Sequence, residues 1–316
     1  MPGRWADTDY ASCMDKLLLD GVEVTTSQLS WRVGDAAACN LLGVVTPATT
    51  TSELVHLMEG VGNLRYSGLR LVGLVDLGVV RKFPSLRYVE VASGHPVDPR
   101  PLECLDNLRG LVLHQPSAGL DFASFPKLEV FVGDWHPENA NLRQEALCDL
   151  SVSGFNPPSR DLSVLRELNG LVNLSLTKTN IQSLVGLESL EDLRRLNLAF
   201  APKLAALDSL AASAQGLRQV YFGHAKAIGS YAPISALRFL RKLQISACAP
   251  MPDLDWTASL TRLSFLSFVD TDVVSGDLSP LLSLERLRYV GTFKKRHYSH
   301  SQAELNAILQ GRTGLT

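Results

Sequence analysis

Isoleucine is scarce in this 316-residue chain, which holds five isoleucines against 55 leucines. An excess of either charge is absent too, because 30 Lys and Arg side chains stand against 32 Asp and Glu, for a net charge of −2. This balance argues against a general nucleic-acid or anionic-membrane binder, since such proteins gather cations on one face. The 46% hydrophobic content excludes disordered, collagen-like and polytopic membrane chains. The leucine excess favours an internal repeat.

Cysteine is sparse, and no C-x-x-C pair is present: the five thiols are Cys13, Cys39, Cys104, Cys148 and Cys248. An odd, scattered set of this kind is typical of reduced thiols in a reducing compartment. The first 30 residues contain one short apolar run, Leu17 to Leu19, between aspartates. That run is too short for a signal peptide or a membrane span. We therefore expect a cytoplasmic protein.

Sequence motifs of catalysis are missing as well. The chain has no G-x-S-x-G elbow, no P-loop, no G-x-G-x-x-G and no H-E-x-x-H. These absences predict a protein that is not an enzyme and that holds no cofactor and no metal.

One stretch shows the repeat clearly. Residues 171–192 read LVNLSLTKTNIQSLVGLESLED, and the pattern starts again at Leu193 with LRRLNL. Alternate side chains of a short strand face opposite ways, so Leu174 and Leu176 are predicted to point into a core. Apolar residues then recur every third position, the spacing of a 3₁₀ or short helical return. With a period of about 22 residues, units start at Leu64, Leu86, Leu108, Leu128, Leu147, Leu171, Leu193, Leu217, Leu240, Leu263 and Leu287.

These units resemble the leucine-rich repeat family, and residues 171–192 are similar to its 22-residue subclass, known from internalins and a protein-phosphatase regulatory subunit. The resemblance implies an α/β solenoid, a leucine-rich repeat horseshoe of about 10 to 11 repeats with a parallel β-sheet on its concave side. Short or 3₁₀ helices would form the convex side, and caps would close both ends. A bacterial, cytosolic protein is implied too. Position 9, counted from the first leucine, usually bonds to turn backbone, and here it holds Thr179, Ala201, Cys248 and Thr271.

Residues 1–63 lack leucine periodicity and are assigned to an N-terminal cap, ahead of repeats over residues 64–293. Val22 and Val24 alternate with Glu23, which predicts a strand. A helix is expected to start at a Ser52 cap. A separately folded N-terminal domain of about 40 residues is the alternative.

Residues 294–316 are assigned to a C-terminal capping segment and helix. Ser301-Gln-Ala-Glu304 is a capping box, and its helix would lay Leu305, Ile308 and Leu309 over the last repeat. The preceding segment from Lys294 to His300 concentrates cations and two histidines. It is either a binding epitope or a part of the cap.

Function in this architecture is expected on the concave strand face, at positions 3, 5, 7 and 8, because side chains alternate along each strand. The position-5 row begins with Glu90, Val112 and Val132. Large rings with polar neighbours suit protein recognition, where Trp and Tyr anchors carry much of the affinity; packing of Trp135 or Phe200 under a loop is the alternative. We expect another protein to dock on a face formed by His114, Asp134, Trp135, Lys178, Asn197, Phe200, Tyr221, His224, Gln244 and Asp270.

A cation recurs at position 2, in Arg87, Arg109, Arg194, Arg218, Arg241 and Arg288. This row of arginines could bind an acidic surface or a phosphate group. The favoured interpretation is a solvated edge, where arginine stems cover apolar surface and carboxylates neutralise them, with Asp192, Glu188 and Glu285 as the candidates.

The sequence thus predicts a monomeric, non-enzymatic protein-binding module that contacts neither nucleic acid nor membrane. Analogy of fold adds an immunity or inhibitor role against a toxin or enzyme. One alternative is a solenoid enzyme with a groove site near His114 and Asp134, which share one position of successive repeats, with His95 and His136 within loop reach; a surface hydrogen bond between His114 and Asp134 is the favoured interpretation. The other is a regulatory subunit of a phosphatase.

Overall fold

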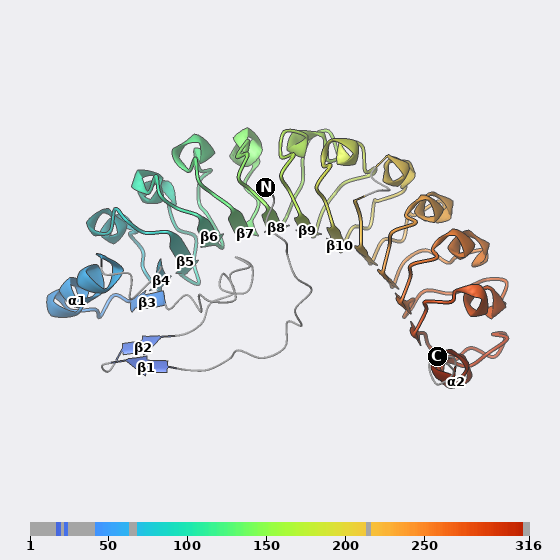
Figure 1. The fold of residues 1–316 in the computed structure, drawn as a ribbon. Coiled ribbons are helices and arrows are strands. Elements are labelled where there is room, and N and C mark those ends of the chain that lie inside the picture. Colours follow the sequence, from blue (N-terminus) through green and yellow to red (C-terminus); the bar gives the residue numbers. More distant parts are fainter. Residues whose placement is uncertain (1–16, 20–21, 25–41, 63–67, 213–215, 312–316) are drawn as a thin grey trace, which may run out of the picture. The chain divides into compact units, whose positions relative to one another are not determined.

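The structure is a computed structural model that describes residues 17–19, 22–24, 42–62, 68–212 and 216–311. It consists of two compact units, Met1–Leu150 and Ser151–Thr316. In each unit, parallel strands form one side and short 3₁₀ helices form the other (Figure 1). No helix in the described part of the chain has the length and apolar character needed to cross a membrane.

The repeat that begins at Leu171 shows why the sequence folds in this way. Strand β9 (Asn173–Thr177) turns Leu174 and Leu176 inward, where each is at most 1% exposed, and leaves Ser175 partly exposed. Beyond the strand, a 3₁₀ helix has three residues per turn and therefore gathers every third side chain on one side. Leu187 lies in the 3₁₀ helix η6 (Leu187–Ser189), Ile181 and Leu184 precede it, Leu190 follows it, and all four are buried.

Position 9 ties one repeat to the previous one. The Thr179 hydroxyl donates to the carbonyl of Phe155 at 2.6 Å, and the Cys248 thiol lies 3.4 Å from the carbonyl of Phe222. The Thr271 hydroxyl accepts from the Cys248 N–H at 3.0 Å, so the predicted backbone-bonding role is confirmed at these three positions. Burial raises the pKa of the Cys248 thiol, which keeps it protonated and unreactive.

In the first unit, strand β1 (Leu17–Leu19) pairs antiparallel with β2 (Val22–Val24). A parallel sheet follows in chain order through β3 (Leu42–Val45), β4 (Gly68–Val72), β5 (Tyr88–Ala92), β6 (Gly110–Leu113) and β7 (Val130–Asp134). Helix α1 (Thr51–Gly62) lies between β3 and β4 in sequence. The returns contain the 3₁₀ helices η1 (Gly78–Lys82), η2 (Arg100–Cys104), η3 (Phe122–Ser124) and η4 (Pro137–Asn141). Strand β8 (Asp149–Ser153) contains the division between the units.

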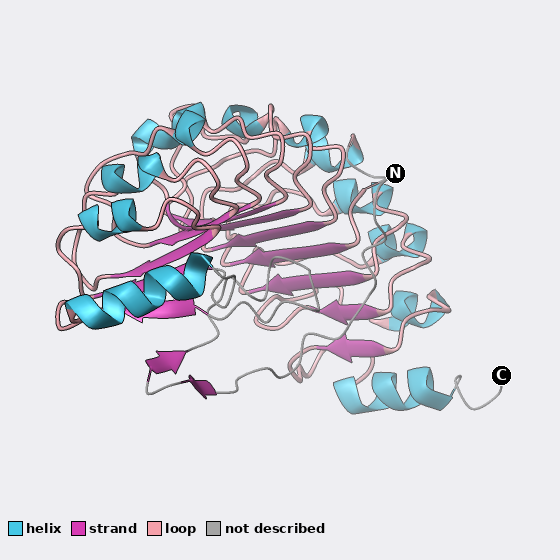
Figure 2. Ribbon diagram, turned by 60° about the vertical axis from the view of Figure 1, so that its left-hand side comes forward, coloured by secondary structure: helices cyan, strands magenta, loops and turns pink. Residues whose placement is uncertain are grey.

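The second unit continues with β9, β10 (Arg195–Ala199), β11 (Gln219–Gly223), β12 (Lys242–Ser246), β13 (Phe265–Ser267) and β14 (Tyr289–Gly291), all parallel (Figure 2). Its returns hold η5 (Ser163–Leu165), η6, η7 (Asp208–Ala211), η8 (Ala232–Ala236), η9 (Asp255–Ser259) and η10 (Ser279–Ser283), and helix α2 (Gln302–Gly311) follows. The register sets equal repeat positions opposite each other: Asn197 pairs with Ser175 on one side and Tyr221 on the other.

The predicted fold class, a leucine-rich repeat solenoid, is confirmed. Every predicted unit start from Leu86 to Leu287 lies two residues before an observed strand. The first start, Leu64, is wrong, because β4 begins at Gly68 and turns Leu69 and Leu71 inward. The cause is a shorter return, which places Gly68 opposite Tyr88, only twenty residues later.

The N-terminal segment differs from the prediction at its helix start. Helix α1 begins at Thr51, and its capping box is formed by Thr50 and Glu53. The Thr50 N–H donates to Glu53 Oε2 at 2.6 Å, and the Glu53 N–H donates to Thr50 Oγ1 at 3.4 Å. Ser52 was the wrong cap because it has no acidic residue three positions later. Residues assigned to the cap also supply β3, a strand of the parallel sheet.

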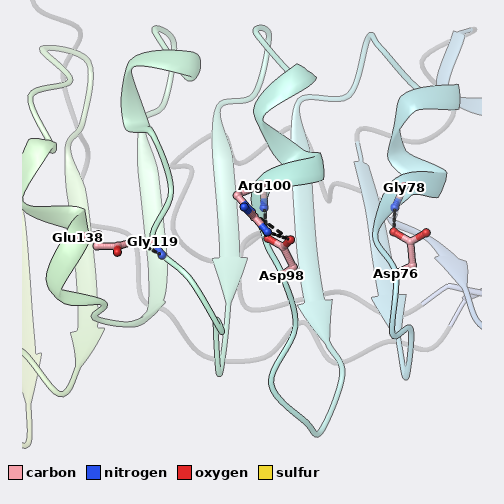
Figure 3. Close-up of polar contacts among 6 residues, drawn as sticks. All are labelled: Asp76, Gly78, Asp98, Arg100, Gly119 and Glu138. Carbon is pink, nitrogen blue, oxygen red and sulfur yellow. Dashed lines mark hydrogen bonds and ion pairs between the residues drawn. The ribbon is translucent and has the colours of Figure 1, made fainter.

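Carboxylates fix the turns of the first unit (Figure 3). Asp76 accepts from the Gly78 N–H at 2.8 Å, and Asp98 accepts from the N–H and the guanidinium of Arg100. The hydrogen bond from Arg100 lowers the pKa of Asp98. From the next repeat, Glu138 accepts from the Gly119 N–H at 3.0 Å. These carboxylates satisfy backbone donors in the turns and therefore serve the fold.

The C-terminal capping box is confirmed. The Ser301 N–H donates to Glu304 Oε2 at 2.7 Å, and the Glu304 N–H donates to Ser301 Oγ at 3.2 Å. Leu305 and Leu309 of α2 are buried, as predicted, but Ile308 is 42% exposed. The buried stripe of this short helix is only one i, i+4 row wide, which leaves Ile308 outside it.

Asn306 pairs with the backbone of β14 from the capping helix. Its Oδ1 accepts from the Val290 N–H at 2.8 Å, and its Nδ2 donates to the Val290 carbonyl at 2.9 Å. An unpaired strand edge can pair with another chain and cause aggregation. At Val290, the Asn306 side chain forms the hydrogen bonds that a neighbouring strand would otherwise form.

We predict that Asn306→Ala lowers the free energy of unfolding by about 1–3 kcal/mol, because it leaves two partly buried backbone groups of Val290 unpaired. Urea unfolding followed by circular dichroism measures the loss. Ala303→Ser, at an exposed position of the same helix, should change stability by less than about 0.5 kcal/mol. Equal stability of the Asn306 variant and the unmodified chain would contradict the edge-pairing role.

Candidate functional site

The candidate site is the open strand face of the second unit, defined as the side chains at positions 3, 5, 7 and 8 of strands β9 to β14 and of the turns that follow them. These side chains alternate away from the buried leucines. The structure places seven of the predicted binding residues on this one unit: Lys178, Asn197, Phe200, Tyr221, His224, Gln244 and Asp270.

Position 5 forms the middle row of the open strand face. The strand register aligns Asn197 with Tyr221 and Tyr221 with Gln244. The Tyr221 ring lies over Gly223, where an added Cβ atom would be 2.4 Å from the phenol oxygen. The absence of a side chain at Gly223 therefore lets the ring lie along its own strand, toward the turn that contains His224.

Position 8 forms a row in which the backbone is left-handed. Positive φ angles between 52° and 56° occur at Lys178, Phe200, His224, Ala247 and Asp270. Non-glycine residues adopt this conformation at a cost of about 1–3 kcal/mol, and such residues gather at functional sites. The rings of Phe200 and His224 stack 4.3 Å apart at 6°, and Phe200 is 49% exposed. Phe200 thus does not pack under a loop.

The prediction included position 3 in the binding face but selected none of the residues of that row in the second unit. Lys242 places its Nζ atom 5.0 Å from the centroid of the Phe265 ring, and that ring stacks on Tyr289 at 4.9 Å. Tyr289 is exposed. The signal was present in the sequence, because Lys242, Phe265 and Tyr289 occupy position 3 of three consecutive repeats. Together with Phe200, Tyr221 and His224, the rings of Phe265 and Tyr289 make three rows of the open strand face partly aromatic.

The remaining predicted residues, His114, Asp134 and Trp135, belong to the first unit. The structure does bring His114 and Asp134 together, with 3.9 Å between Nδ1 and Oδ2. The same Asp134 oxygen accepts from the Gln115 N–H at 2.8 Å, so it is engaged in fixing a turn. Both side chains are substantially exposed, and Trp135 is half-buried.

His95 and His136 were predicted to lie within loop reach of His114 and Asp134. Each ring instead contacts a residue one or two positions away in the chain. His95 Nδ1 lies 3.3 Å from the Pro96 carbonyl, and His136 Nδ1 accepts from the Glu138 N–H. Among the described residues, no three His, Cys, Asp or Glu side chains are arranged to hold a metal ion. The geometry around His114 is that of turns and a surface pair.

The strand face of the first unit is different in character from that of the second. Val112 and Val132, predicted to be presented at position 5, are 2% and 6% exposed, and Glu90 is also buried. The two valines form one buried cluster with Tyr88 and Val130. These four side chains come from the neighbouring parallel strands β5, β6 and β7. The expectation that this row is accessible was therefore wrong.

The segment from Lys294 to His300 bonds to the loop of the preceding repeat. Lys295 pairs with Asp272 at 3.1 Å, His297 Nε2 lies 3.0 Å from the Val273 carbonyl, and the Tyr298 hydroxyl accepts from the Val273 N–H. Of the two interpretations left open by the sequence, the contacts favour a part of the cap.

No protein-family model matches this sequence, and a search of curated proteins finds no match. Among solved structures, the chain is similar to an internalin (inlF) from Listeria monocytogenes, with 18% identity, a TM-score of 0.51, and coverage of 88% of this chain and 78% of the other. It is also similar to the functional domain of InlJ from the same organism, with 17% identity, a TM-score of 0.50, and coverage of 74% and 54%. Internalin C2 (inlC2) shares 19% identity over 68% of this chain and 83% of its own, with a TM-score of 0.43. The likenesses to inlF and InlJ show a leucine-rich repeat fold.

Proposed function

We propose that this chain is a non-enzymatic, cytoplasmic protein-binding module that uses the open strand face of its second unit. The observation that carries the proposal is a group of rings on one face: Phe200 stacks on His224, both exposed, and the partly exposed Tyr221 lies over Gly223. Rings on a rigid sheet lose little conformational freedom on binding, and buried aromatic anchors dominate most protein interfaces.

Polar neighbours complete the open strand face. Gln244 lies next to Tyr221 in register, while Lys178 and Asp270 belong to the position-8 row. An interface of this type has an aromatic centre and a polar rim, which excludes water from the anchors and selects the partner by hydrogen bonding.

The specific role that we propose is an immunity or inhibitor function, in which the chain binds a toxin or enzyme and restrains it. This step rests on analogy of fold, which does not determine function. A rigid preformed face suits an inhibitor, because little ordering entropy is lost on binding. The alternative of an enzyme at His114 and Asp134 has weaker support, since Asp134 already accepts a backbone hydrogen bond.

The test is a comparison of partner capture by the unmodified chain and by Tyr221→Ala and Phe200→Ala. A captured protein that is purified and titrated should bind each variant at least about 30-fold more weakly, because an aromatic anchor contributes about 2 kcal/mol or more. Stoichiometric loss of the partner's own activity on binding would identify an inhibitor, and unchanged activity would indicate a scaffold.

The matched control removes exposed apolar side chains from the returns of the same unit, at Val185 and Val274. Val185→Ala and Val274→Ala should leave the affinity unchanged. If these variants lose the partner while Tyr221→Ala keeps it, the binding surface is the return side and the proposed placement is wrong.

A further inference from the structure

Arginines gather at the edge where the strands of the second unit begin. The predicted position-2 row contributes Arg241 and Arg288, and Arg262 and Arg286 directly precede the repeat leucines Leu263 and Leu287. Between Arg241 and Arg288 the row holds Ser264, a short side chain whose hydroxyl donates to the Arg241 carbonyl at 3.0 Å. The missing long side chain opens a hollow of about 390 Å³, lined by Arg241, Arg262, Ser264, Arg286 and Arg288.

Among the described residues, none of the three carboxylates considered for the solvated edge lines this hollow. Asp192 does pair with Arg194, at 3.6 Å, but it stands outside the hollow. Glu285 offers Arg288 its backbone carbonyl, at 2.6 Å, and Glu188 accepts from the Gly186 N–H. Among the described residues, the lining of the hollow includes four arginines and no acid.

The equivalent edge of the first unit serves as an internal comparison. A hollow there is lined by Arg87, Arg109 and Lys127, and it also contains Glu129. Glu129 accepts from Arg109 Nε at 2.9 Å and forms an ion pair with the same guanidinium. The first unit thus supplies its own carboxylate to its cations, whereas the described residues that line the hollow in the second unit include none.

The arginines of the second unit are also held in place. Phe239 lies under two guanidinium groups, with the carbon of Arg262 4.6 Å and that of Arg218 5.1 Å from the ring centroid. Partial burial lowers the pKa of Arg218, and the positive charges of Arg194, Arg241 and Arg262 lower it further. The edge is therefore a preorganised region of positive potential in a chain whose net charge is −2.

We propose that this arginine hollow binds an acidic segment, a run of Asp or Glu residues, of the protein that docks on the open strand face. Planar guanidinium groups match carboxylates with two parallel hydrogen bonds, which lysine cannot do. The hollow is local, in a chain whose net charge is −2, whereas a nucleic acid requires cations along an extended track. The hollow adds a charged anchor at the edge of the aromatic face.

A fluorescein-labelled hexaglutamate peptide tests this assignment by fluorescence anisotropy at about 50 mM salt, where screening is weak. The full chain should bind the peptide, and Arg262→Gln combined with Arg286→Gln should weaken binding roughly tenfold or more, because two charge-assisted contacts are lost. Ser264→Glu should abolish binding, since it places a carboxylate among the four arginines. Circular dichroism verifies that each variant is folded.

Arg166→Gln combined with Arg238→Gln removes the same charge at exposed positions outside the hollow and should leave peptide affinity unchanged. Equal binding by the Arg262/Arg286 variant, or retained binding by Ser264→Glu, would overturn the proposal. Tighter binding of a ten-thymidine DNA strand than of the peptide would overturn the acidic-segment assignment. The proposal rests on the proposed function for its partner, but the peptide assay reports on the hollow alone, so either can fail without the other.

Discussion

Gly186→Ala is expected to lower the free energy of unfolding by about 2–5 kcal/mol, through left-handed strain and steric overlap. Gly186 has φ of +99°, a conformation that side-chain-bearing residues rarely adopt. An added Cβ atom would lie 2.5 Å from the carbonyl carbon of Leu162 and 2.6 Å from the Ser163 nitrogen. These are backbone atoms of the previous repeat, so they cannot move aside as the end of a side chain can.

Urea unfolding of the purified chain measures this effect, and Gly229→Ala is its matched control. At Gly229 the nearest atom to an added Cβ is the Ala205 carbonyl oxygen, at an ordinary 3.8 Å. We expect the control to change stability by less than about 1 kcal/mol. Equal unfolding midpoints for the two variants would show that successive repeats are not packed as closely at Gly186 as the structure indicates.

Phe222→Ala should lower the free energy of unfolding by about 3–5 kcal/mol, whereas Tyr221→Ala should lower it by less than about 1 kcal/mol. The two residues are neighbours on β11. Phe222 is fully buried among the inward side chains of the repeats, and Tyr221 lies on the open strand face. Removing the first leaves a cavity in the core, and removing the second exposes little that was covered.

Thermal and urea unfolding of this pair test the facing of the strands directly. Similar losses for both variants would place Tyr221 in the core and remove it from the proposed interface. With the expected result, Tyr221→Ala becomes a clean probe of function, because any loss of partner binding then arises on a folded chain. Phe222→Ala is the variant in which lost binding would report only lost structure.

The repeat architecture could be predicted because its signal is local. Leu174 and Leu176 differ by two positions and Ile181 to Leu190 by multiples of three, and these spacings specify strand and 3₁₀ return without reference to any distant residue. The same reasoning located the capping box at Ser301 and Glu304, which bond to each other across one turn of helix. The N-terminal helix start was wrongly placed at Ser52, because the prediction did not require an acidic residue three positions after the cap.

Features that depend on neighbours in space were harder to predict. The start at Leu64 was wrong because one short return shifts the register of β4. Val112 and Val132 face away from the leucines as expected, yet they are buried with Tyr88 and Val130. Whether an outward side chain is exposed depends on its neighbours in adjacent strands, and those are set by the length of every return between them.

Leucine spacing alone was enough to establish the solenoid, the inward face of each strand and the alternate face where a partner could bind, because these follow from backbone periodicity. It took the tertiary structure to show which part of that alternate face is open, that Phe265 and Tyr289 stack on it, and that Ser264 leaves a hollow among arginines. The stacked rings and the hollow each join residues more than twenty positions apart, and only the parallel register brings them within contact distance.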